Sequence, residues 1–180
     1  MSDAEVRENH SVMPEVAIEP AIGRMLWMIE DTRALTLDAL SGVDEHQLDW
    51  LPSDGVNSIG TLLYHIAAIE ADWLFVEVRE EPFPEHVTAR FDYRVRDATG
   101  RLTVVTGRTL EDHLALLGTI RYLLLDTFAG MAMANYQRPR TMPKYDVTPE
   151  WVLHHLMQDE AEHRADISEL RRRFALAAAG

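Results

Sequence analysis

The chain has 180 residues, of which 47% are hydrophobic and 26% are charged, so it is long enough for one globular domain with a sizeable core. Its formal net charge of −13 argues against general binding to nucleic acid or to an anionic membrane, because both need a basic surface. The absence of cysteine excludes disulfides, thiolate metal ligands and a cysteine nucleophile. No stretch approaches ~20 continuous apolar residues, so we expect no transmembrane helix and, by default, a cytoplasmic location.

The N-terminal region divides into a leader and a first helix. Residues 1–16 are polar and lack a helical period, and we interpret them as a flexible leader. A single domain is expected over residues 17–176. Its first helix is predicted to begin near residues 18–20, with proline in the opening turn, and to stop at Ser41-Gly42.

A second helix and an insert follow a link rich in turn residues. Asn57 or Ser58 is predicted to cap this helix, which runs to about Val78 and ends before two prolines. The insert spans about 79–108 and is not helical in pattern. Alternation at Phe91, Tyr93 and Val95, a turn at 97–100 and a β-prone run at 102–106 favour a short β-hairpin, with an irregular loop as the alternative.

The C-terminal half carries two further helix signals. Thr109, with acids behind it, predicts a helix that ends at Gly130, and residues 131–147 are predicted to form a long loop. Thr148-Pro149-Glu150 is a strong helix start, and the final helix is expected to reach about Phe174. Four long amphipathic helices with one insert between the second and third predict an all-α four-helix bundle.

Three polar residues occupy helical positions where the pattern calls for apolar side chains. The stripes that contain them step by three or four residues, so each is one face of a helix. The first stripe is Leu62, His65, Ile69, Trp73 and Val76, and the second is Val152, Leu156, Asp159, His163, Ile167, Leu170 and Phe174. Unpaired buried polar groups cost several kcal/mol, so these residues need partners, and a shared metal ion would supply one.

Helical spacing permits several ligand sets. Asp159 and His163 are four residues apart, so they stack on adjacent turns of one face, and Glu160 with His163 is a second option. His155 lies on the same face and is a further ligand or an outer partner, while His65 would reach the ion from a facing helix. The alternative interpretation of Asp159 and His163 is a hydrogen-bonded pair that binds no metal. His113 is expected to be an ordinary hydrogen-bonded histidine at the edge of the core.

Two segments resemble the DinB-like superfamily. Residues 57–67 read NSIGTLLYHIA, which is similar to the second helix of that family, and residues 48–52 (LDWLP) match its approach. Residues 152–164 read VLHHLMQDEAEHR and resemble its last helix, where the usual form is His-x3-His followed by Arg. With the helix order and the insert, the resemblance covers most of the chain beyond residue 17.

The resemblance implies a metal-binding four-helix bundle. Carried over residue by residue, its metal triad falls on His65, Asp159 and His163. The family commonly has histidine at the position of Asp159, its thiol-dependent isomerase branch has glutamate there, and Ala165-Asp166 stands where Gly-Gln usually follows. These departures set the chain apart from the best-known branch.

Two classes of function follow from the resemblance. The first is a metal-dependent enzyme, a thiol-dependent S-transferase or isomerase or a hydrolase, acting on a small molecule with a divalent metal, zinc or nickel. Because the chain lacks cysteine, any thiol must arrive as a low-molecular-weight cofactor. The second is a non-catalytic dimeric bundle that binds a small ligand or is related to stress. A homodimer is expected in either case.

Overall fold

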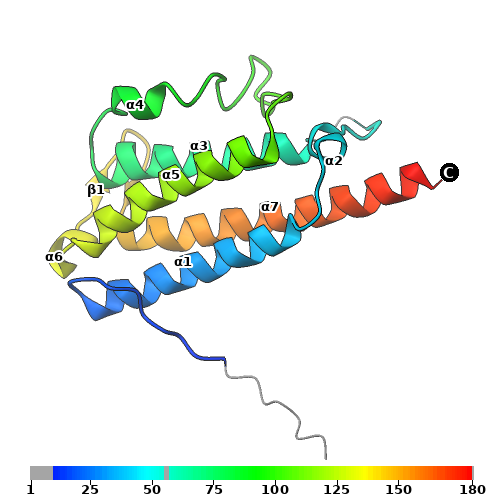
Figure 1. Ribbon diagram of the computed structural model, residues 1–180. Coiled ribbons are helices and arrows are strands. Elements are labelled where there is room, and N and C mark those ends of the chain that lie inside the picture. The colour runs from blue at the N-terminus through cyan, green and yellow to red at the C-terminus, as the bar shows by residue number, and fades with distance from the viewer. Residues whose placement is uncertain (1–9, 55–56, 180) are drawn as a thin grey trace, which may run out of the picture.

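A computed structural model, which describes residues 10–54 and 57–179, confirms the all-α bundle of four long helices (Figure 1). These helices are α1 (Pro20–Ala39), α3 (Ile59–Asp72), α5 (Leu110–Ala129) and α7 (Pro149–Ala178). Figure 1 shows α3 beside α5 in one layer and α1 beside α7 in the other, and these two pairs also make the most extensive contacts. A π-helix, η1 (Trp73–Val78), continues α3 without a break.

The connections contain short elements. Three single-turn helices are α2 (Glu45–Asp49), α4 (Glu85–Thr88) and α6 (Met133–Tyr136). The insert between α3 and α5 holds α4 and a tight turn closed by a single antiparallel bridge between Arg96 and Leu102, so it is a loop with a minimal hairpin. The two-stranded antiparallel sheet lies instead in the predicted loop 131–147, as β1 (Arg140–Thr141) and β2 (Asp146–Val147).

Side-chain caps fix where three of the four long helices, α3, α5 and α7, begin, as the sequence predicts. The Ser58 hydroxyl accepts a hydrogen bond from a backbone N–H of the first turn of α3, and Thr148 does the same for α7. Thr109 and Asp112 form a reciprocal capping box at the start of α5. Just beyond α1, Gly42 adopts φ +75°, a left-handed conformation in which a side chain would be strained.

The predicted leader lies partly outside the described residues, since its first nine positions are not described. Residues 10–16 contain no helix or strand, and the Glu15 backbone N–H donates to the Gly23 carbonyl over 3.0 Å. A Cβ at Gly23 would lie 2.4 Å from the Glu15 carbonyl oxygen. Glycine at this position therefore lets the backbone of Glu15 lie directly against α1.

The continuous helix of α3 and η1 forms the centre of the bundle. Over Ile59–Val78 it is long and apolar enough, with a mean hydropathy of 1.3, to cross a membrane by those two measures alone. However, 78% of that stretch is buried inside the bundle. Such burial is typical of the core helix of a compact domain, which explains why the stretch is apolar without a membrane.

A buried ion-pair cluster joins all four long helices through one residue from each: Arg33 of α1, Glu70 of α3, Arg121 of α5 and Glu160 of α7. The Arg33 guanidinium donates to Glu160 over 2.6 and 3.2 Å and to Glu70 over 2.9 Å. Arg121 donates to Glu70 over 2.8 and 3.0 Å and to Glu160 over 2.9 Å. The two positive and two negative charges balance, so the bundle axis carries a saturated polar network.

Arginine controls the ionisation of Glu70 in this cluster. Burial alone would raise the pKa of Glu70, but the facing Arg121 and Arg33 outweigh burial, and the pKa of Glu70 is lowered. Glu30 adds a contact from the rim, where it accepts from Arg121 over 2.8 Å. Because every charge in the cluster depends on its partners, removing one leaves another buried and uncompensated.

Candidate metal centre

The helices bring His65, Asp159 and His163 together. One potential ligand atom from each residue lies within 4.8 Å of the other two. The two imidazole rings meet edge to face, with centroids 4.9 Å apart and planes at 88°, and His163 Nε2 lies 3.7 Å from Asp159 Oδ1. Two imidazoles and a carboxylate therefore converge on one small volume between α3 and α7.

Two facing helices supply this geometry. Asp159 and His163 project from successive turns of α7, as the four-residue spacing predicts. His65 projects from α3, which packs directly against α7. His65 is buried and the other two are partly exposed, so the cluster lies at the edge of the core with access to solvent on one side.

The three residues fit a divalent metal ion. Ligand bonds of about 2.1 Å in tetrahedral geometry place ligand atoms roughly 3.4 Å apart, so side chains now within 4.8 Å of one another would close by at most about 1.4 Å around an ion. The Nδ1 atom of His65 is buried without a hydrogen-bond partner in the described part of the chain, whereas Nδ1 of His163 makes no hydrogen bond but lies 3.5 Å from Asp166 Oδ2. Two imidazoles and one carboxylate are also a typical protein ligand set for a catalytic metal.

Electrostatics keep the imidazole of His65 uncharged at neutral pH. Burial lowers the pKa of His65 to about 4, with further lowering by His163 and Arg96. At neutral pH this ring is therefore uncharged, which is the form that binds a metal. Burial raises the pKa of Asp159, although His163 and His155 oppose the effect. A cation at this site would supply Asp159 with a counter-charge.

The alternative ligands weighed from the sequence lie elsewhere. Glu160 turns into the buried ion-pair cluster, where Arg33 and Arg121 occupy its carboxylate oxygens. The ring of His155 stacks on Trp151, with centroids 4.8 Å apart and planes at 14°, and meets Trp73 edge to face at 5.0 Å. Neither residue belongs to the converging group of ligand atoms.

Asp166 is a partner that sequence reasoning noted only as a departure from a motif. Its Oδ2 lies 3.5 Å from His163 Nδ1, while His163 Nε2 faces Asp159. A carboxylate on the far nitrogen of a metal-bound histidine orients the ring and raises its basicity. The three-residue spacing between His163 and Asp166 indicates this contact from sequence alone, because it places both side chains on one face of α7.

His113 differs from its predicted role as a hydrogen-bonded residue at the edge of the core. Its side chain is only 1% exposed, and both ring nitrogens lack hydrogen-bond partners among the described residues. Its Nε2 would lie 3.2 Å from a Cβ placed at Gly60, so the glycine makes room for the ring. Burial lowers the pKa of His113 to about 4, and nearby Arg108 lowers it further, against Asp49 and Asp112.

The buried His113 predicts a specific loss of stability in acid. The pKa of His113 in the folded chain, about 4, lies below the ordinary value of 6.5. Between these pH values the unfolded chain therefore binds a proton at His113 that the folded chain does not. Stability should therefore fall as pH drops from 6.5 towards 4, by about 3 kcal/mol from this residue. His113→Leu should flatten that slope in urea unfolding, whereas His46→Gln, at an exposed position, should not. An unchanged slope in His113→Leu would contradict this assignment.

Comparison with known proteins supports the fold and the family. The profile of the DinB superfamily matches residues 28–167. The crystal structure of a conserved protein from Enterococcus faecalis superposes with a TM-score of 0.65 at 15% sequence identity, covering 82% of this chain and 93% of that chain. At such low identity this likeness shows the fold alone. No curated protein matches the chain significantly.

Proposed function

Because this chain belongs to the DinB superfamily, we propose that it is a metal-dependent enzyme in which His65, Asp159 and His163 hold one divalent ion, zinc or nickel. The observation that carries this proposal is the convergence of two imidazoles and a carboxylate, from two facing helices, within 4.8 Å. Metal binding is general in the superfamily, which agrees with that geometry. The substrate is proposed to be a small molecule.

Three protein ligands would leave one coordination position of the ion open for water or a thiol. A divalent ion there would act as a Lewis acid that activates the bound water or thiol. His65 would contribute an uncharged imidazole, and Asp159 would contribute a negative charge that partly offsets the charge of the ion. Asp166 would hold the His163 ring in orientation. The chain has no cysteine, so a thiol nucleophile would be a low-molecular-weight cofactor. The proposed reactions are S-transfer or isomerisation with such a thiol, or hydrolysis.

A second candidate is a non-catalytic homodimer that binds a small ligand. Exposed apolar side chains support it, because Leu37 of α1 and Tyr122 of α5 line a cavity of about 360 Å³ between these helices, and Tyr122 is 68% exposed. Turnover of small thiols with electrophiles would exclude the non-catalytic alternative. Sedimentation that shows a monomer at micromolar concentration would contradict the dimer.

Metal analysis tests the proposed centre. Protein purified without added chelator is expected to contain about one zinc or nickel ion per chain, and His65→Ala should contain almost none. His154→Ala is the matched control, because His154 is an exposed histidine on α7 outside the cluster. If the parent chain takes up no stoichiometric zinc or nickel, or if His65→Ala and His154→Ala retain equal metal, the proposal fails.

A further inference from the structure

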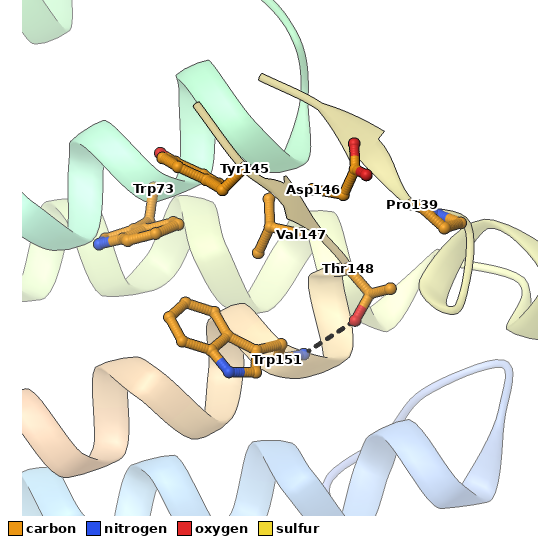
Figure 2. A pocket seen from close by; sticks show the side chains of 7 residues that line it. All are labelled: Trp73, Pro139, Tyr145, Asp146, Val147, Thr148 and Trp151. Carbon is orange, nitrogen blue, oxygen red and sulfur yellow. Dashed lines mark hydrogen bonds between the residues drawn. The ribbon is translucent and has the colours of Figure 1, made fainter. Parts of the chain in front are cut away.

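A second cavity lies about two helical turns from the metal cluster. It has a volume of about 400 Å³ and is bounded by Trp73 of η1, the β1–β2 region and the first turn of α7 (Figure 2). Trp73 is eight residues beyond His65, which corresponds to roughly 12 Å along the helix. The residues that line this cavity are Trp73, Pro139, Tyr145, Asp146, Val147, Thr148 and Trp151.

Three aromatic side chains dominate this cavity. The ring of Trp73 lies 5.4 Å from that of Trp151 and 6.1 Å from that of Tyr145, between ring centroids. In Figure 2, Tyr145 is drawn above Trp73 and Trp151 below it, and Val147 appears between Tyr145 and Trp151. The negative faces of aromatic rings attract cations, and indole does so most strongly.

Charge around the cavity is negative on its aromatic side. Glu77, four residues beyond Trp73 on η1, accepts a hydrogen bond from the Tyr145 hydroxyl over 2.7 Å. Its side chain is buried, with 5% exposed, its Oε2 has no hydrogen-bond partner, and no ion pair to it exists within the described ranges. Among the described residues Glu77 is thus a buried carboxylate without an ion-pair partner, and it is hydrogen-bonded to the hydroxyl of a ring that lines the cavity.

Hydrogen bonding links that carboxylate to the cavity. A phenol that donates to a carboxylate becomes richer in electrons, which strengthens the attraction of its ring for a cation. Asp146 supplies a carboxylate in the lining itself, and neither lysine nor arginine belongs to the lining. The basic neighbours lie outside the lining, where Arg138 and Arg140 both approach Glu80 and Lys144 is exposed beside Tyr145.

We propose that this cavity binds an organic ammonium ion, held against Trp73, Trp151 and Tyr145, with the Glu77 carboxylate as the buried counter-charge. The apolar lining accommodates the alkyl groups of such an ion, while the rings and the carboxylate discriminate in favour of its charge. None of the three proposed metal ligands, His65, Asp159 and His163, lines this cavity, so the ammonium site does not depend on the proposed metal. It gives the chain a selectivity for positively charged small molecules.

Choline and its uncharged isostere 3,3-dimethyl-1-butanol test the proposal, because they differ mainly in the charge of one atom. Binding is measured by calorimetry on the full chain, both chelator-treated and metal-loaded, so that failure of the metal proposal does not affect the result. Choline is expected to bind at least tenfold more tightly than the isostere in both preparations. Equal binding would make the cavity a simple apolar pocket and overturn the proposal, as would the absence of choline binding.

Matched variants locate the site. Trp151 is 46% exposed, so Trp151→Ala should leave the bundle folded and weaken choline binding more than tenfold. Glu77→Gln keeps an acceptor for Tyr145 but removes the charge, so it should weaken choline binding severalfold and leave binding of the isostere unchanged. Tyr122→Ala, an exposed aromatic residue outside the cavity, is the control. Wild-type affinity in both cavity variants, or equal loss in Tyr122→Ala, would refute this location.

Discussion

Replacing Arg121 by methionine is expected to lower the free energy of unfolding by about 3–5 kcal/mol, as for other buried ion pairs that lose one partner. The substitution removes the guanidinium that contacts Glu70, Glu160 and Glu30. Glu70 and Glu160 would then share only Arg33, which leaves excess negative charge on the bundle axis. Urea unfolding followed by circular dichroism measures the effect.

Two further variants make this prediction specific. Arg172→Met removes an exposed ion pair with Glu169, so it should cost at most about 1 kcal/mol. The double variant Arg121→Met, Glu70→Leu retains the balanced Arg33–Glu160 pair, so it should be more stable than Arg121→Met alone. The cluster does not behave as a coupled network if Arg121→Met lowers the free energy of unfolding no more than Arg172→Met does. The same conclusion follows if adding Glu70→Leu to Arg121→Met lowers the free energy of unfolding further instead of raising it.

Asp159→Asn is expected to weaken metal binding more than any outer-partner substitution, by well over 100-fold. The change removes the negative ligand but preserves size and shape. Burial raises the pKa of Asp159, so without metal the neutral asparagine should leave the melting temperature unchanged or slightly higher. Competition with a chelator of known affinity gives the dissociation constant, and the melting temperature of the metal-free protein separates ligation from folding.

A graded series on α7 provides the controls for Asp159. Asp166→Asn acts only through the orientation of His163, so it should weaken metal binding by about 10- to 100-fold. Glu162→Gln changes a nearby exposed carboxylate outside the cluster and should have little effect. If Glu162→Gln or Asp166→Asn weakens metal binding more than Asp159→Asn does, the carboxylate ligand lies elsewhere on the helix.

The sequence predicted the four long helices because their signals are local. Ser58, Thr109 and Thr148 each satisfy backbone N–H groups within one turn, so a short segment determines where the helix begins. The small sheet at β1 and β2 was missed because strands of two residues carry no alternation, and the prolines around them indicated a loop. The β-prone run at 102–106 forms only one bridge, since an isolated hairpin has little to stabilise it.

Polar residues on apolar stripes indicate part of the buried chemistry. His65, Asp159 and His163 can be predicted from sequence, because metal chemistry favours imidazole and carboxylate, and the structure brings them together. Arg33 and Arg121 also occupy core positions between buried residues on α1 and α5, but a guanidinium on a helix stripe does not indicate a metal ligand. Periodicity gives the face of a helix but not the partner across it, so Glu160 could not be assigned to the arginines from sequence.

Cobalt substitution tests the metal centre most directly, because four-coordinate Co²⁺ has visible absorption bands that report its ligands. The metal-free chain loaded with one equivalent of Co²⁺ should show intense tetrahedral bands, which His65→Ala, Asp159→Asn and His163→Ala should each shift or abolish. If Glu160→Gln folds, its Co²⁺ spectrum should match that of the parent chain, because Glu160 belongs to the buried ion-pair cluster and not to the metal site. Identical spectra for the parent chain and all three ligand variants would contradict the central claim that these residues hold the ion.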